Sequence, residues 1–174
     1  MAHDVYRLFR SYNEPLVRYL TRRLGDRDWA EEVAQETFLR ALRQETLTNE
    51  RAWLFAVATN LVRDEARKDS RRRQRLELLR AEEQDRVVES PAVTLERRED
   101  ATRARRALDL LAERDREALL MREEGLDYLE IAEALELSAG SVGTTLARAR
   151  RRLVEAYESL QRGARAPGTG HAAS

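Results

Sequence analysis

The 174 residues are enough for one ordinary domain or two small ones, and 32 basic residues balance 32 acidic ones. Binding to nucleic acid would therefore have to come from local clusters of charge. Cysteine is absent, which excludes disulfides and thiolate metal sites, and the only histidines, His3 and His171, lie at the two ends. No apolar run approaches a membrane span and the N-terminus has no apolar signal-peptide core. We expect a cytoplasmic protein that has no membrane contact, no metal and no cofactor.

Three amphipathic helices are predicted in the first part of the chain, over residues 3–24, about 28–43 and about 49–68. The first helix has Asp4 as its predicted cap and Gly25 as its predicted stop. Pro15 lies inside it, so a kink or a break is expected near Asn13, because proline cannot donate the helical hydrogen bond. The three helices carry enough apolar residues for one small core, which predicts a first domain over residues 1–68.

The second of these helices has an acidic face opposite its apolar stripe. Its members are Glu31, Glu32, Gln35, Glu36, Leu39 and Arg40. An acidic face with an exposed leucine suits a basic protein partner better than DNA. The alternative is a solvated acidic face that binds nothing.

The third helix carries a candidate nucleic-acid site. Asn60 interrupts an apolar stretch, and Arg63, Arg67 and Lys68 follow it on the polar side. The cations could bind phosphates. Alternatively, Asn60 satisfies a buried backbone group and has no binding role.

The helical pattern is lost after Lys68 and returns near Thr94. Residues 69–93 contain three consecutive arginines and a Ser90-Pro91 break, so they are predicted to form a flexible linker, and the two helical units are not expected to form one rigid body. A second domain is predicted over residues 94–160, with helices at about 95–111 and 114–124. The small, Gly/Pro-rich tail, 161–174, is predicted to be disordered.

Residues 126–153 contain a predicted helix-turn-helix. Asp127 and Glu130 have the spacing of a capping box, Glu136 and Leu137 turn the chain, and Ser138 can cap the next helix. The inward face of that helix is expected to carry Val142, Leu146, Ala149 and Leu153, and the outward face Ser141, Thr144, Thr145, Arg148, Arg151 and Arg152. This layout offers small polar side chains to base edges and arginines to phosphates. The alternative is an amphipathic hairpin with a solvated basic face.

Three stretches resemble the extracytoplasmic-function sigma factors, the minimal two-domain members of the bacterial sigma-70 family. They are DWAEEVAQETFLRAL (28–42), RAWLFAVATNLVRDEARK (51–68) and LDYLEIAEALELSAGSV (126–142). The resemblance covers about residues 4–160. It implies an all-α fold of two small helical domains joined by a flexible linker, the second containing the helix-turn-helix. It also implies a protein that is not an enzyme, gives core RNA polymerase its promoter specificity and helps to open the promoter.

The resemblance also implies roles for the candidate surfaces. The acidic face would dock on the clamp helices of the polymerase β′ subunit, and the second domain would contact the β flap. Asn60 would lie by the promoter −10 element, where an unpaired base is held, with Arg63, Arg67 and Lys68 on the phosphates. The helix-turn-helix would bind the −35 element. Many relatives are held by an anti-sigma factor that buries their polymerase-binding surfaces.

Two departures from the family pattern limit what the resemblance implies. The loop over residues 44–50 is short and lacks the usual aromatic residue, so the identity of the captured base is left undetermined. Many relatives have lysine in place of Gly143 and arginine in place of Thr145, so the preferred −35 sequence stays open and duplex binding by the second domain alone is expected to be weak.

The alternative function is a helix-turn-helix transcription regulator whose N-terminal half senses a signal or dimerises. It predicts a ligand pocket or a self-complementary apolar face within residues 4–68. An enzyme is disfavoured, because the only histidines lie at the two ends of the chain and neither domain has a Gly-rich phosphate loop or a nucleophile motif.

Overall fold

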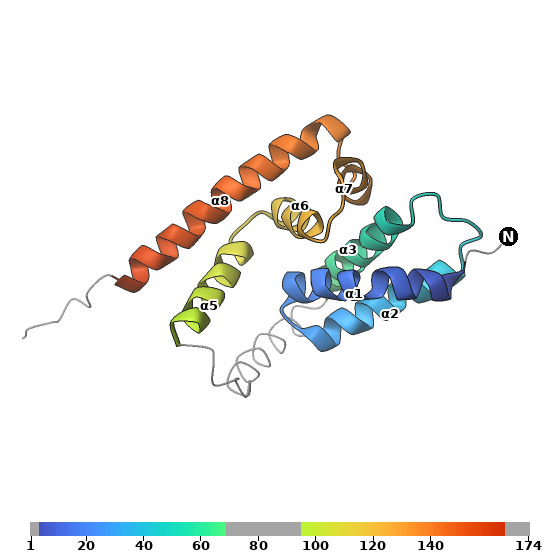
Figure 1. Cartoon of the computed structure of the whole chain (residues 1–174), viewed down its shortest axis with the longest axis horizontal. Helices are drawn as coiled ribbons and strands as arrows, with labels where there is room; N and C mark the ends of the chain where they lie inside the picture. The colour runs from blue at the N-terminus through green and yellow to red at the C-terminus, as the bar shows by residue number, and fades with distance from the viewer. Residues whose placement is uncertain (1–3, 69–94, 166–174) are drawn as a thin grey trace, which may run out of the picture.

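The computed structural model describes residues 4–68 and 95–165, and within these ranges all regular secondary structure is helical. The helices are α1 (Val5–Leu24), α2 (Arg27–Leu42), α3 (Glu50–Lys68), α5 (Leu95–Asp109), α6 (Glu113–Glu123), α7 (Tyr128–Leu135) and α8 (Ala139–Arg165). Figure 1 shows α1 to α3 as one group and α5 to α8 as another. The predicted linker, 69–93, and the tail from residue 166 lie outside the described residues. None of the described helices is long and apolar enough to cross a membrane.

The first helix begins and ends where the sequence predicts. The Asp4 carboxylate accepts a hydrogen bond from the backbone N–H of Arg7, and Gly25 follows the last turn with a positive φ of 71°. Pro15 lies inside α1, yet the helix continues through it without a break. Of the two predicted outcomes, the break is therefore wrong, and the kink near Asn13 stays a prediction. Leu8 and Leu16, on either side of the proline, are both fully buried in the same core, which offsets the one lost hydrogen bond.

The core of the first unit lies where α1, α2 and α3 cross. Tyr19 and Phe55 pack with ring centroids 5.1 Å apart, and the Tyr19 hydroxyl lies 2.7 Å from that of Thr59. Burial raises the pKa of Tyr19, so this phenol stays protonated as a hydrogen-bonding group. The indole N–H of Trp29 donates to Glu65 at 2.7 Å, which ties α2 to α3.

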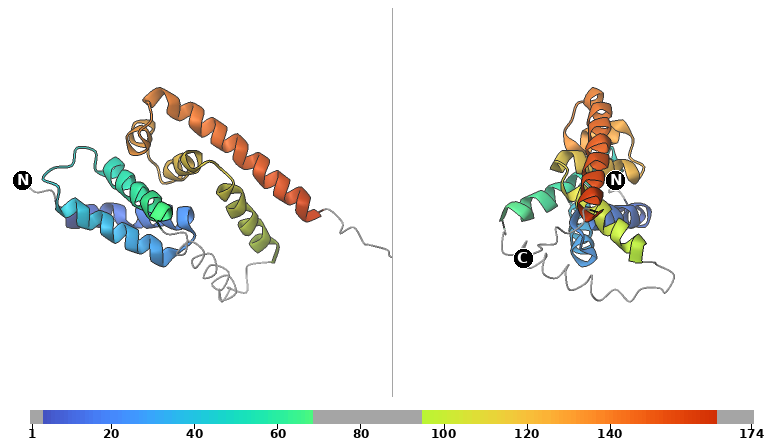
Figure 2. Two further views of the ribbon diagram at one scale, coloured as in Figure 1. Left: turned by 180° about the vertical axis from the view of Figure 1, so that it is seen from behind. Right: turned by 90° about the vertical axis from the view of Figure 1, so that its left-hand side faces the viewer.

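The second unit is organised around the long helix α8. Its N-terminal half packs on α6 and α7 and its C-terminal half lies beside α5, extending away from the first unit (Figures 1 and 2). The predicted capping box of α7 is present between Asp127 and Glu130, and Glu136 ends α7 with a left-handed φ of 55°. The helix α8 continues to Arg165, so residues 161–165 are helical and the predicted disordered tail begins too early. From the start of α8 at Ala139, no proline interrupts the sequence before Pro167.

The two units lie against each other, with α6 on α1 and α7 on α3. Figure 2 shows this arrangement from behind and from the side. The sequence predicts that the two units do not form one rigid body in the free protein, and this stays a prediction, although the units contact each other in the structure. The contact depends on pairs of charges from distant parts of the chain, which no apolar stripe reveals.

Candidate polymerase and nucleic-acid interfaces

The acidic face of α2 is open to solvent. Among its predicted members Glu31, Glu32, Gln35 and Leu39 are exposed and Glu36 is half-buried, and Leu39 keeps 47% of its surface exposed. Glu31 pairs with Arg27 at 3.0 Å and Glu36 with Arg40 at 3.2 Å, both one helical turn away. Exposed pairs of this kind contribute only about 0.3–0.5 kcal/mol, so a partner's cations can replace them.

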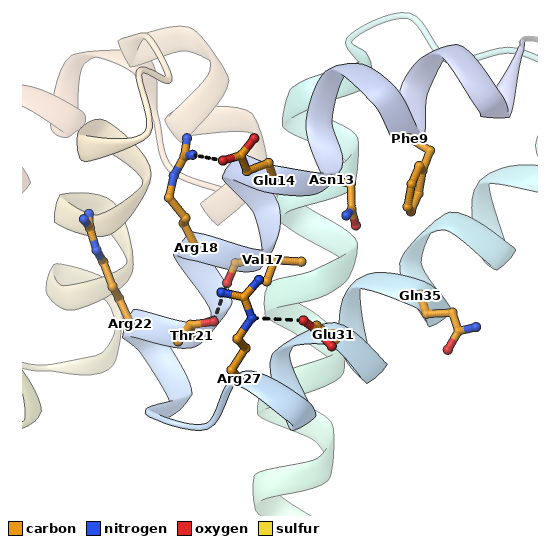
Figure 3. Close-up of a pocket in the computed structure, with 10 residues that line it drawn as sticks. All are labelled: Phe9, Asn13, Glu14, Val17, Arg18, Thr21, Arg22, Arg27, Glu31 and Gln35. Carbon is orange, nitrogen blue, oxygen red and sulfur yellow. Dashed lines mark hydrogen bonds and ion pairs between the residues drawn. The ribbon is translucent and has the colours of Figure 1, made fainter. Parts of the chain in front are cut away.

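A groove of about 620 Å³ runs beside this face, between α1 and α2. Figure 3 shows Phe9 and Asn13 of α1 on one side of it and Glu31 and Gln35 of α2 on the other. Phe9 is exposed and also packs edge-on against Phe38, with centroids 5.3 Å apart. The sequence did not indicate the groove, because periodicity places Phe9 in the buried stripe of α1. The acidic face and the groove together form one amphipathic surface.

On α3 the predicted promoter-binding residues divide into two environments. Asn60 is exposed, which argues against the alternative that it satisfies a buried backbone group. Arg63, one turn later, is largely covered and its side chain contacts α6 of the second unit. Arg67 and Lys68 lie in the last turn of α3, and their side chains lie outside the described part of the structure.

The carboxylate of Glu117 holds Arg63 in this position. Glu117 is fully buried, and it accepts hydrogen bonds from the Arg63 guanidinium and, at 3.2 Å, from Nε of Arg23. Glu113, one turn earlier on α6, accepts from Arg23 at 3.0 Å. A buried carboxylate needs such partners, because an unpaired charge in this environment would be strongly unfavourable.

The start of α8 presents two of the predicted base-reading residues. Thr144 is exposed and Ser141 is half-buried, with its hydroxyl donating to the Ser138 carbonyl at 2.8 Å. Thr145 is only 5% exposed, so the prediction that it lies on the outward face is wrong. Residue 145 follows Val142 by three positions, which sets it on the inward stripe. It was expected on the outward face because its side chain is polar.

The arginines of α8 also differ from one another. Arg148 donates two hydrogen bonds to Asp115, at 2.6 Å and 3.2 Å, and Arg152 approaches the same carboxylate at 3.3 Å. Asp115 is 1% exposed, so both arginines fasten α8 to α6. Arg151 is exposed to solvent. The sequence predicted equivalent phosphate contacts for all three, whereas the structure gives two of them a partner within the unit.

Two further features were missed by the sequence analysis. A groove of about 400 Å³ between α5 and α8 is lined mainly by apolar side chains: Ala104, Leu108, Leu153, Val154 and Tyr157. The second feature is the contact between the units, to which α1 contributes Arg18, Arg22 and Arg23. The clustering of these arginines near the end of α1 was a visible signal, but it did not show that glutamates lie opposite.

Comparisons with known proteins agree with this two-unit architecture. Residues 8–72 match the model of Sigma-70 region 2, and residues 101–153 match that of Sigma-70, region 4. The ferric citrate uptake sigma factor FecI of Escherichia coli (strain K12) is 31% identical over 82% of this chain and 84% of its own length. The ECF RNA polymerase sigma factor SigM of Bacillus subtilis (strain 168) is 30% identical over 86% of this chain and 93% of its own length.

A solved structure has a similar fold. It is the sigma factor RpoE of Bartonella quintana, crystallised with the anti-sigma factor NepR, at a TM-score of 0.59 and 24% identity over 82% of this chain and 89% of that chain. The region 2 and region 4 matches fall on the two helical units described above, in the same order. The chain therefore belongs to the sigma-70 family, and within it to the extracytoplasmic-function sigma factors, which direct RNA polymerase in transcription initiation.

Proposed function

We propose that the separate surfaces of this sigma factor divide its work. The acidic face of α2 and the adjacent groove bind core RNA polymerase, the exposed side of α3 holds the melted −10 element, and the start of α8 reads the −35 element. The observation that carries the proposal is that the acidic face and Leu39 stay exposed, although α6 and α7 cover parts of α1 and α3. A surface of exposed carboxylates beside a groove that contains Phe9 and Val17 suits a basic, partly apolar protein partner.

Promoter melting would use Asn60 with the cations that follow it. A base removed from its stack must be held by contacts worth a few kcal/mol, since unstacking costs about that much. The exposed amide of Asn60 offers both a donor and an acceptor to such a base. Arg63, Arg67 and Lys68 would bind the neighbouring phosphates once Arg63 is released from Glu117.

Recognition of the −35 element would use Ser141 and Thr144 for base edges and Arg151 for a phosphate. Their support is their position on the second helix of a helix-turn-helix, where Thr144 and Arg151 are exposed and Ser141 is half-buried. Arg148 and Arg152 would act mainly by fixing the angle of α8 through Asp115. The apolar groove between α5 and α8 is a suitable dock for the β flap. In this scheme residues 1–68 and 94–160 are the functional domains, and the protein works in the cytoplasm.

An anti-sigma factor would act on the same polymerase-binding surface. The related RpoE structure contains the anti-sigma factor NepR, and we infer that this chain also has an inhibitor of that class. Its target would be the groove between α1 and α2, because an amphipathic helix could pack on Phe9 and pair with the arginines and glutamates that line the groove.

The decisive experiment is run-off transcription with purified core polymerase on a library of randomised promoters. We expect a defined promoter class to be transcribed only when this chain is added, because a conventional regulator cannot start transcription on core enzyme alone. The Glu32→Lys/Glu36→Lys variant should lose core binding and transcription while keeping its helical circular dichroism spectrum. The matched control is Glu96→Lys/Glu99→Lys on exposed α5 positions, which should bind core normally. Normal core binding by the first variant would refute the role of the acidic face.

A further inference from the structure

Charges are sorted by sign across the contact between the two units. In each ion pair described there, the arginine comes from α1 or α3 and the glutamate from the second unit. The arginines are Arg18, Arg22, Arg23, Arg51 and Arg63, and the glutamates are Glu113, Glu117, Glu124 and Glu130. Such sorting is a property of the three-dimensional arrangement, because the whole chain has no net charge.

The contact is ordered around carboxylates that are largely covered. Glu117 is fully buried, and the side chain of Glu124 is 5% exposed while it accepts a hydrogen bond from Arg18 at 3.0 Å. At the other end of the contact, Arg51 donates two hydrogen bonds to Glu130, at 2.5 Å and 2.6 Å. Bidentate arginine–carboxylate pairs of this kind have a defined geometry and are stronger than ordinary surface pairs.

Arg63 cannot serve this contact and a nucleic acid at the same time. Its Nε and Nη2 both point at Glu117, and Nε also lies 3.7 Å from Glu113. A DNA phosphate would use the same donors. The second unit therefore presents to the first unit the kind of charge that DNA presents.

The proposed polymerase-binding surface is not part of the contact. The acidic face of α2 remains exposed while α6 packs on α1 and α7 on α3. Core polymerase could therefore dock on the closed protein before the units separate.

We propose that α6 and α7 act as an internal substitute for promoter DNA, which holds the free sigma factor in a closed form that binds core polymerase but not the −10 element. This inference rests on the proposed role of α3 in promoter binding. Binding of polymerase to both units supplies the free energy that separates them, and only then does Arg63 become available. Exchange between the closed and open forms breaks these ion pairs and uncovers apolar residues that both units contribute to one buried cluster, without a covalent step.

The first test locks the closed form. Asn49 donates to Glu133 across the contact at 2.7 Å, and both residues are exposed. The chain has no cysteine, so Asn49→Cys/Glu133→Cys can be joined by a short bis-maleimide that a reductant cleaves. We expect the joined protein to bind core polymerase but to form no open complex on a promoter from the run-off library, and cleavage should restore opening.

The controls of this test separate the two proposals. Single-cysteine variants treated with the same bis-maleimide should open the promoter both before and after the reductant is added. Promoter opening by the joined protein would overturn the inference, and loss of core binding on joining would overturn the proposed order of docking. If the proposed function is wrong, the unmodified chain itself starts no transcription.

The second test weakens the contact between the two units at Glu117. Glu117→Gln removes the charge that holds Arg63, and should raise the affinity of the free chain for labelled mixed-sequence single-stranded DNA by at least about fivefold, the low end of typical coupling between sites. The matched control is Glu155→Gln, which makes the same change of charge on an exposed position of α8. Adding Arg63→Ala to Glu117→Gln should abolish the gain. An affinity equal to that of Glu155→Gln would refute the role of Glu117.

Discussion

Two buried carboxylates on α6, two residues apart, each bind a pair of arginines, yet one pair comes from the same unit and the other from the neighbouring unit. Asp115 binds Arg148 and Arg152, which come from the same unit and from one helix. Glu117 binds Arg23 and Arg63, which come from two helices of the other unit. Residues two apart lie on nearly opposite sides of a helix, so α6 faces its own unit with one side and its neighbour with the other.

Arginine–carboxylate pairs therefore link helices within one unit at Asp115 and link the two units to each other at Glu117. When the Asp115 pairs break, the second unit loses the link between α6 and α8. When the Glu117 pairs break, the contact between the units loses its buried ion pairs, and the apolar residues that both units contribute to one buried cluster remain. Polar contacts between units are typical of arrangements that change during function.

Removing Asp115 should give the largest effect on stability. Asp115→Ala leaves two arginines without their buried partner, and we expect the second unit to lose about 3 kcal/mol, the low end for breaking a buried pair, because those arginines can turn to water. Glu117→Ala leaves Arg23 and Arg63 without their carboxylate, but we expect a smaller loss, because the two units can separate and return both arginines to water. Urea unfolding of the full chain measures both, with Glu155→Ala as the exposed control. If Asp115→Ala and Glu117→Ala lowered the free energy of unfolding equally, the distinction between pairs within a unit and pairs between units would be wrong.

The inward side of α8 provides the second comparison. Thr145→Arg forces a charge into a site that is 5% exposed, and should cost about 1–3 kcal/mol through overpacking and loss of solvation. Thr144→Arg adds the same charge on the exposed side, should leave stability within about 0.5 kcal/mol and should strengthen duplex binding. Thermal unfolding and a duplex-binding titration measure the two effects. A Thr145→Arg variant as stable as Thr144→Arg would return Thr145 to the outward face.

The third prediction separates the arginines of α8 by function. Arg151→Ala should weaken holoenzyme binding to all −35 sequences about equally and make the log–log salt slope shallower by about 0.9, as expected for one lost phosphate contact. Arg148→Ala should instead lower the thermal stability of the free protein, because it removes a bidentate pair with Asp115. The contrast fails if Arg148→Ala changes only the salt slope and leaves stability intact.

The smallest expected effect concerns pH at the edge of the contact. Hydrogen bonds from Arg51 hold the pKa of Glu130 below its ordinary value, despite the opposite effect of its partial burial. A lowered pKa means that the pair stabilises the closed form above the ordinary glutamate range, near pH 4.3, and that this stabilisation is lost as the pH falls through the lowered value. Fluorophores at Ser11→Cys and Ser159→Cys, both exposed positions, should report opening in acid. Glu130→Gln should flatten this pH response, and an unchanged response would exclude Glu130 as its source.

The helices and their caps could largely be predicted from the sequence, because each depends on neighbouring residues. Asp4, Gly25 and the Asp127–Glu130 capping box all act within one or two turns. The acidic face of α2 was also predictable, since helical periodicity fixes which residues lie opposite a buried stripe.

The contacts of the arginines could not be predicted in this way. Arg63 and Glu117 are 54 positions apart, and Arg148 and Asp115 are 33 apart. Periodicity shows that an arginine leaves the core, but not what lies opposite. For the same reason the sequence assigned Arg63, Arg148 and Arg152 to DNA, whereas the structure gives each a carboxylate of the protein itself.

The covering of Arg63 by α6 also affects how the free protein is distributed in a cell. A chromosome offers an enormous excess of sites to which basic proteins adhere through phosphate contacts alone. Pairing Arg63 with Glu117 removes one such phosphate contact from the free protein and so lowers its affinity for this background. More of the free molecules then stay in solution, where they compete with other sigma factors for a limited number of polymerases.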